Sequence, residues 1–183
     1  MELVVLLDED GRATGTADKA LVHNRETPLH LAFSTYVFDP RGRFLLTRRA
    51  LDKRTWPGVW TNSCCGHPGP EEVMTDAIRR RLRAELGITV GDIDLVLPRF
   101  RYRAVMGDGT VENEMCPVFR AVTSDDPAPD PAEVMDFRWT QWPPEGDLSP
   151  WARDQIGQLT GLGPEPGRWP LADSGELPPA VTN

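Results

Sequence analysis

The segment from about Pro70 to Leu86 has the clearest helical pattern in this chain of 183 residues. Two glutamates lie in its first turn and Gly87 follows its last residue, as is common at the two ends of a helix. An amphipathic helix of this length must bury one face against another layer of structure. The apolar residues that would form this face are Met74, Ala77, Ile78 and Leu82.

Most of the other patterned segments predict β-strands, at residues 2–8, 29–38, 44–49, 59–64, 95–105, 111–122 and 134–139. Turn-forming stretches such as Asp39-Pro40-Arg41-Gly42 separate them. One or two helical turns are expected at 18–24, and Ser149-Pro150 predicts the start of a closing helix through about Leu159. Antiparallel hairpins around one long helix predict an α+β sandwich.

The length suits one domain with its own core, which we expect to span residues 1–160. From Gly161 onward the chain is rich in proline and glycine and has no periodic pattern. Residues 161–183 are therefore expected to form a tail that is extended or disordered and lies over the domain.

The net charge of -8 argues against nucleic acid as a partner, because proteins that bind nucleic acid usually carry a basic face. A small anionic substrate remains compatible, since a few cations can line a local pocket. No segment has the roughly 20 apolar residues that cross a membrane, and no export signal is expected at the N-terminus. The three cysteines are an odd number, so we expect reduced thiols and a cytoplasmic protein.

Each of the three histidines, His23, His30 and His67, is by itself more often a packing or capping residue than a metal ligand. His67 differs because it follows Cys65 closely, in Asn62-Ser63-Cys64-Cys65-Gly66-His67-Pro68. We interpret Cys64 as a core residue and Cys65 as the reactive candidate. Near the start of a helix, a thiol is expected to be exposed and to have a lowered pKa.

Strand alternation places Glu112, Glu114 and Cys116 on one face of their predicted strand. A solvated face is the simpler interpretation of two such glutamates. If the hairpin loop is centred on Asp108, however, Tyr102 faces Glu114, where a phenol can hold a carboxylate or relay a proton. A shift of one residue would put Tyr102 on the other face.

Imidazoles and carboxylates together form a ligand set that suits Zn, Mn, Fe or Mg, and the residue types do not choose among these ions. The basic residues Lys19, Arg49, Lys53 and Arg81 are individually most often surface charges. Arg81 and Glu85 are also helix neighbours four residues apart, which is typical of an ordinary ion pair.

Several blocks of this sequence resemble a known family. Gly66-x5-Glu72-x7-Arg80, followed by Leu82, Glu85, Gly87 and Ile88, is similar to a degenerate Nudix box in which Arg81 and Ala84 fill two usual acidic positions. Further blocks resemble the type I isopentenyl-diphosphate isomerases. They are residues 29–34, 47–50, 56–62, 65–68, 100–104 and 112–114, and the match extends from about Thr14 to Trp151.

The resemblance implies a Nudix-like fold of mixed and antiparallel sheets, and it implies roles for matching residues. Metal ligands would be His23, His30, His67, Glu112 and Glu114, around one Mn²⁺ or Zn²⁺. Glu85 would bind Mg²⁺ together with the substrate diphosphate. Lys19, Arg49, Lys53 and Arg81 would hold the diphosphate, and Trp151 would face a cationic intermediate.

The implied reaction, in isoprene biosynthesis, converts isopentenyl diphosphate to dimethylallyl diphosphate through a carbocation. It requires an acid and a base on opposite sides of an alkene in a dry pocket. We expect Glu114, supported by Tyr102, to deliver the proton and Cys65 to act as the base. The expected partner is a small isoprenoid diphosphate, bound by a monomer.

Two other functions are compatible with parts of the pattern. A Nudix pyrophosphohydrolase would share the fold, but Arg81 and Ala84 stand where hydrolases carry acidic residues. A non-catalytic metal-binding module would explain the histidines, but not the paired carboxylates and the basic residues.

Overall fold

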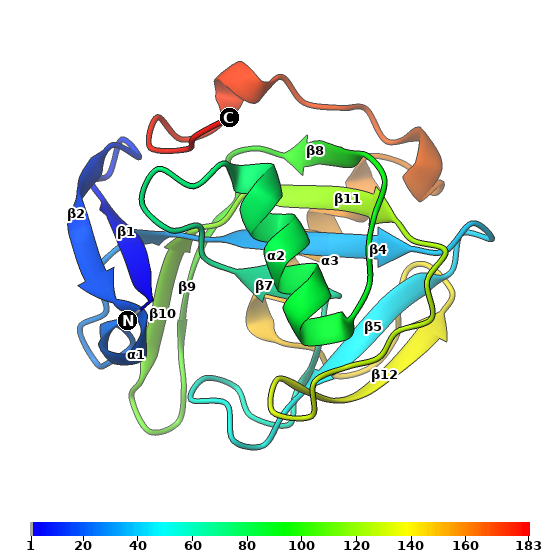
Figure 1. Cartoon of the computed structure of the whole chain (residues 1–183), viewed down its shortest axis with the longest axis horizontal. Helices are drawn as coiled ribbons and strands as arrows, with labels where there is room; N and C mark the ends of the chain where they lie inside the picture. Colours follow the sequence, from blue (N-terminus) through cyan, green and yellow to red (C-terminus); the bar gives the residue numbers. More distant parts are fainter. Residues whose placement is uncertain (1) are drawn as a thin grey trace.

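The computed structural model describes residues 2–183 and contains two β-sheets with helices packed on them (Figure 1). The strands are β1 (Leu3–Leu7), β2 (Ala13–Asp18), β3 (His30–Leu31), β4 (Phe33–Phe38), β5 (Phe44–Arg49), β6 (Trp60–Thr61), β7 (Cys64–Gly66), β8 (Ile93–Leu97), β9 (Arg101–Val105), β10 (Val111–Met115), β11 (Val118–Val122) and β12 (Val134–Thr140). The helices are α1 (Lys19–Val22), α2 (Met74–Leu86) and α3 (Pro150–Gly161), followed by the 3₁₀ turns η1 (Pro166–Arg168) and η2 (Ser174–Glu176).

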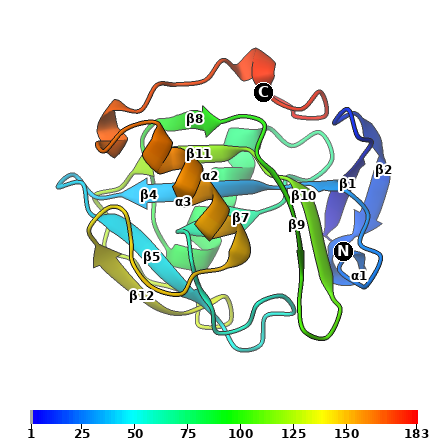
Figure 2. The same ribbon diagram turned by 180° about the vertical axis from the view of Figure 1, so that it is seen from behind.

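The first sheet has the order β2-β1-β3-β10-β9. The second has the order β12-β5-β4-β11-β8, with β6 added to β5 and β7 added to β4. Helices α2 and α3 cover opposite faces of the second sheet, as the two views show (Figures 1 and 2). This arrangement confirms the predicted α+β sandwich. None of the helices in residues 2–183 has the length and apolar character needed to cross a lipid bilayer.

The central strand β4 is buried along its whole length because both of its faces are covered. Its side chains alternate between two cores. Phe33 and Val37 pack with α2, whereas Tyr36 and Phe38 pack with α3. Both faces of β4 are therefore dry, so every position of the strand is buried, including those of the polar residues Ser34 and Thr35.

Two segments pass from one sheet into the other. Ala32 alone separates β3 from β4, and Cys116-Pro117 separates β10 from β11. The two segments run parallel, with Glu114 beside His30 in the first sheet and Val118 beside Ser34 in the second. The sheets diverge at this crossing, so residues of both sheets can face one cavity.

Helix α2 begins at Met74, so the predicted start near Pro70 is wrong. Glu71 has a φ of 62°, in the left-handed region, which prevents the helix from extending through it. The predicted end is confirmed, because Gly87 adopts the left-handed conformation that commonly follows a helix.

The predicted strands differ from the structure in several places. The segment 59–64 divides into β6 and β7, while 95–105 and 111–122 divide where their chains leave one sheet for the other. Strand β2 was not predicted, because Ala13–Asp18 has no apolar alternation and is mostly exposed at a sheet edge. The predicted register of the long hairpin is confirmed, since Tyr102 pairs with Glu114 and Ala104 pairs with Glu112.

The segment after α3 is extended apart from η1 and η2 and lies across the domain beside β8 (Figures 1 and 2). Trp169 is buried in the core under α3, and Leu177 packs against the core under α2. The backbone N–H of Ala180 donates to the carbonyl of Gly11 at 3.0 Å, and that of Met74 donates to the carbonyl of Thr182 at 2.9 Å. The last residues thus satisfy a backbone donor at the start of α2.

Candidate active site

A cavity of about 590 Å³ opens where the two sheets diverge. Its walls come from α1, the loop after β5, β7, α2, the β9–β10 hairpin and α3. It is lined by most of the residues singled out from the sequence, which are Lys19, His23, Arg49, Lys53, Cys65, His67, Arg81, Glu85, Tyr102, Glu112, Glu114 and Trp151. His30 lies behind this wall, fully buried beside Glu114.

Three imidazoles surround one carboxylate oxygen at the base of this cavity. The Nε2 atoms of His67, His30 and His23 lie 2.9, 3.3 and 3.8 Å from Oε1 of Glu114. The parallel pairing of β3 with β10 places His30 beside Glu114. His23 directly follows the last residue of α1, and His67 directly follows the last residue of β7. One donor atom from each of the four residues lies within 4.8 Å of the others, a spacing that suits a metal ion.

The surroundings of this cluster fit a bound cation. Nε2 of His23, Nε2 of His30 and Nδ1 of His67 are buried and have no hydrogen-bond partner within residues 2–183. Burial lowers the pKa of His67 to about 4, which keeps its imidazole neutral and able to bind a metal. Burial opposes the charge on Glu114, but the three neighbouring histidines lower its pKa well below the usual value.

Glu112 lies beside this cluster but outside the group of four donors. The Tyr102 hydroxyl lies 2.6 Å from Oε2 of Glu112 and 2.9 Å from Oε2 of Glu114. Burial and the neighbouring Glu114 raise the pKa of Glu112. The register predicted that Tyr102 faces Glu114, and the structure adds a contact of the same phenol with Glu112.

The adjacent cysteines have different surroundings. Cys64 is 3% exposed and packs in the core with α2, whereas Cys65 lines the cavity. The expectation of a lowered thiol pKa is wrong, because burial raises the pKa of Cys65 to about 12. Helix α2 begins nine residues later, at Met74, so its N-terminus does not stabilise a thiolate at Cys65.

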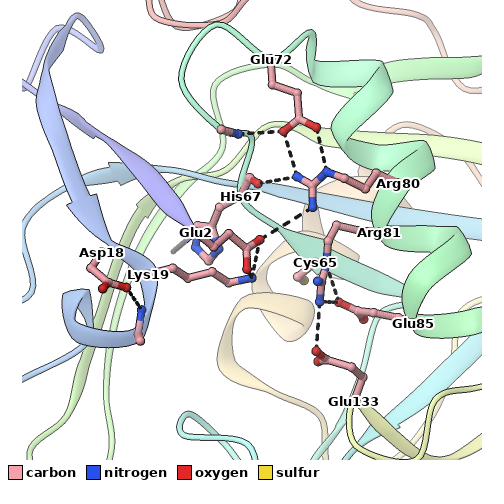
Figure 3. Close-up of polar contacts among 12 residues, drawn as sticks. Glu2, Asp18, Lys19, Cys65, His67, Glu72, Arg80, Arg81, Glu85 and Glu133 are labelled. Carbon is pink, nitrogen blue, oxygen red and sulfur yellow. Dashed lines mark hydrogen bonds and ion pairs between the residues drawn. The ribbon is translucent and has the colours of Figure 1, made fainter.

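Cations and carboxylates alternate on the opposite wall of the cavity (Figure 3). Lys19 donates to both oxygens of Glu2 at 3.1 Å, and Lys53 pairs with Glu133. Arg81 pairs with Glu85, its predicted helix neighbour, and lies 3.4 Å from Glu133. Three cations thus lie on one wall, and each is paired with a carboxylate that an anion could replace.

Arg49 and Trp151 lie together on the remaining wall. The Arg49 guanidinium lies 5.5 Å from the centre of the indole and donates to the carbonyl of Thr55 at 2.9 Å. Trp151 is 2% exposed, and its Nε1 donates to Oδ1 of Asn62 at 2.9 Å. Tyr102 also packs against this indole, so aromatic groups border the side of the cavity next to Glu114.

Sequence reasoning missed Glu2, Glu133 and Asn62. Glu133 precedes β12 and has no motif or periodicity that distinguishes it from other surface acids. Asn62 stands within the Cys65 motif, and a polar amide inside the strand predicted at 59–64 was a signal that could have identified it.

The comparisons with known proteins agree with this geometry. A family model described as NUDIX domain matches residues 28–158. The isopentenyl-diphosphate Delta-isomerase of Saccharopolyspora erythraea is 58% identical over 99% of this chain and 97% of its own length. That of Mycolicibacterium vanbaalenii is 54% identical over 88% of this chain and 93% of its own length.

Among solved structures, the protein DR0079 from Deinococcus radiodurans superposes with a TM-score of 0.64. The superposition covers 86% of this chain and 98% of that protein at 15% identity, so it supports the fold alone. The similarity to the Saccharopolyspora erythraea isomerase extends over 99% of the chain and therefore covers the site as well as the fold. The chain therefore belongs to the isopentenyl-diphosphate Delta-isomerase family and carries its NUDIX domain.

Proposed function

We propose that this enzyme converts isopentenyl diphosphate into dimethylallyl diphosphate, with Cys65 and Glu114 as the catalytic pair. The observation that carries this proposal is the cavity itself. On one side it holds a thiol, a phenol and a carboxylate among three imidazoles, and on the other side it holds a row of cations. The first side provides groups that move protons, and the second provides ligands for a diphosphate.

The substrate would be oriented by its charged end, because its alkene has no polar group. Lys19, Lys53 and Arg81 would bind the diphosphate in place of Glu2 and Glu133, their present partners. Glu85 would hold Mg²⁺ together with the diphosphate. Arg49 would reach the same group by turning away from Thr55.

We assign Glu114 as the proton donor and Cys65 as the base, so the reactive form carries a proton on Glu114 and a thiolate at Cys65. In the metal-free protein the resting protonation is the reverse, because the three histidines lower the pKa of Glu114 and burial raises the pKa of Cys65. Glu114 must therefore receive a proton before it can deliver one to the alkene. Tyr102 contacts both carboxylates, so its hydroxyl can pass a proton from Glu112 to Glu114.

His23, His30, His67 and Glu114 would hold one Mn²⁺ or Zn²⁺, with Glu112 as a further ligand after a small movement. A divalent ion there would fix the position of Glu114 and compensate its negative charge. The indole of Trp151 would stabilise the carbocation by about 2 kcal/mol once its environment is dry.

Incubation with isopentenyl diphosphate and Mg²⁺ in D₂O tests this function. The expected result, read by NMR, is dimethylallyl diphosphate that carries deuterium. Release of phosphate without isomerisation would instead identify a pyrophosphohydrolase. Absence of turnover with Mg²⁺, Mn²⁺ and Zn²⁺ would identify a non-catalytic metal-binding module.

A further inference from the structure

Asn62 is fully buried between β6 and β7, and its amide is hydrogen-bonded on both sides. Its Nδ2 donates to the carbonyls of Cys64 and Thr35, at 3.0 and 3.3 Å. These two acceptors fix the orientation of the amide, because a flipped amide would set its oxygen against two carbonyl oxygens. The Oδ1 atom of Asn62 must therefore face the opposite direction.

Three donors converge on this Oδ1 atom. The Trp151 Nε1–H lies at 2.9 Å, the Thr61 hydroxyl at 3.0 Å and the Cys65 thiol at 3.2 Å. An indole N–H can only donate, so its presence independently confirms that an oxygen occupies this position. One oxygen atom thus contacts both the thiol on β7 and the indole on α3.

A second neutral group holds the Cys65 sulfur from another side. The Ser34 hydroxyl lies 3.4 Å from this sulfur and accepts a hydrogen bond from Nε2 of Gln155 at 2.9 Å. Oε1 of Gln155 in turn accepts from the Tyr36 hydroxyl at 2.9 Å. Ser34, Gln155 and Tyr36 are all fully buried, so the network that ends at the thiol is rigid.

We infer that Asn62 is a positioning residue, which aligns the Cys65 thiol and the Trp151 indole with each other on the cavity wall. Cysteine has a single side-chain torsion to its sulfur, and without a partner it would sample several staggered positions. A displacement of about 1 Å at a reacting atom can lower a rate by about 10²-fold. The kinetic consequence rests on the proposed isomerase function, whereas the effect on the thiol does not.

The test compares Asn62→Ala with Thr61→Val, which removes a donor from the same oxygen without touching the thiol or the indole. Asn62→Ala is expected to lower kcat by about 10- to 100-fold and to change the KM for isopentenyl diphosphate by less than about twofold. Lys19, Lys53 and Arg81 lie on another wall, so only this small KM change is expected. Thr61→Val is expected to change kcat by less than about twofold.

A second measurement follows alkylation of Cys65 by iodoacetamide, read by peptide mass spectrometry at fixed pH. Loss of the carbonyl frees the thiol and admits water, so we expect alkylation about threefold faster or more in Asn62→Ala. If the wild type shows no turnover, the proposed function fails, and the alkylation rate still decides the role of Asn62.

Equal alkylation rates in Asn62→Ala and the wild type would overturn the inference. So would an equal loss of kcat in Thr61→Val, because it would indicate a general packing defect. If Asn62→Ala gives little folded protein, Asn62→Thr conserves most of the volume. The threonine side chain is too short for its hydroxyl to contact both the Cys65 thiol and the Trp151 indole. Asn62→Thr is therefore expected to show the same loss of kcat and the same faster alkylation as Asn62→Ala.

Discussion

At the scale of single residues, Cys64 and Cys65 form an internal control for the proposed chemistry. They differ in their surroundings, since one packs beneath α2 and the other borders the cavity. We expect Cys65→Ala to lower isomerisation by about 10²- to 10⁴-fold, the range for loss of an acid–base group. Glu114→Gln is expected to have a similar effect.

Cys64→Ala is expected to keep most of the activity and to lower Tm, because it leaves a small void in the core. Deuterium incorporation by NMR and thermal unfolding measure the two effects. Robust turnover by Cys65→Ala would contradict the assigned catalytic pair.

His67 makes the stability of the metal-free protein depend on pH. Burial lowers its pKa from 6.5 to about 4 in the folded protein. Between these values only the unfolded chain binds the proton, so stability falls as the pH falls. We expect a loss of about 2 kcal/mol between pH 6.5 and about pH 5.

His30 has a raised pKa, so its protonation stabilises the folded protein. This contribution is opposite in sign to that of His67, and it is lost mainly as the pH rises above 6.5. Chemical denaturation in the presence of a chelator measures the slope, with His67→Gln as the comparison. An unchanged slope in that variant would show that another group is responsible.

At the scale of elements, the loop between β7 and α2 carries His67 and is fastened to the helix (Figure 3). The Arg80 side chain donates to Glu72 at 2.7 and 2.8 Å and to the carbonyl of His67 at 3.3 Å. Glu72 also accepts from the backbone N–H of Gly69. This arrangement positions His67, a proposed metal ligand, through residues outside the group of four donors.

We expect Glu72→Gln to weaken divalent metal binding by about tenfold, since groups that orient a ligand have effects of this size. Tm should change little, because the ion pair is partly exposed. Calorimetric titration with Mn²⁺ or Zn²⁺ provides the measurement. Arg83→Gln, at an exposed position of the same helix, is the control and should bind as the wild type does.

The ends and the pairing of elements were predictable from the sequence where neighbouring residues in the chain determine them. The register of the β9–β10 hairpin followed from its loop, and Gly87 ended α2 as expected. The division of the long strands was not predictable, because it depends on which sheet each half joins. Strand β2 was missed since its pairing with β1, and not its composition, makes it a strand.

At the scale of the whole molecule, the C-terminal segment contributes to the fold. Leu177, Ala180 and Val181 pack against the core under α2, and the carbonyl of Thr182 accepts from the N–H of Met74. We expect deletion of residues 177–183 to reduce stability by about 2 kcal/mol or more, because it exposes apolar surface and a backbone donor.

Thermal unfolding of the shortened chain measures this effect. Leu171→Ser is the matched control, because Leu171 lies in the same segment with 58% of its surface exposed. An unchanged Tm on deletion would show that the segment does not stabilise the domain.

The sequence by itself determined the fold class and the family resemblance, because each depends on residue types at fixed local spacings. It predicted the hairpin register once the loop was assumed to centre on Asp108, and it identified most of the residues that line the cavity. Only the tertiary structure decided the pKa of Cys65, the separation of Glu112 from the four-donor group and the role of Asn62. These properties depend on burial and on contacts between distant segments. Asn62 and Trp151, for example, meet only because α3 packs across the strands that carry the thiol.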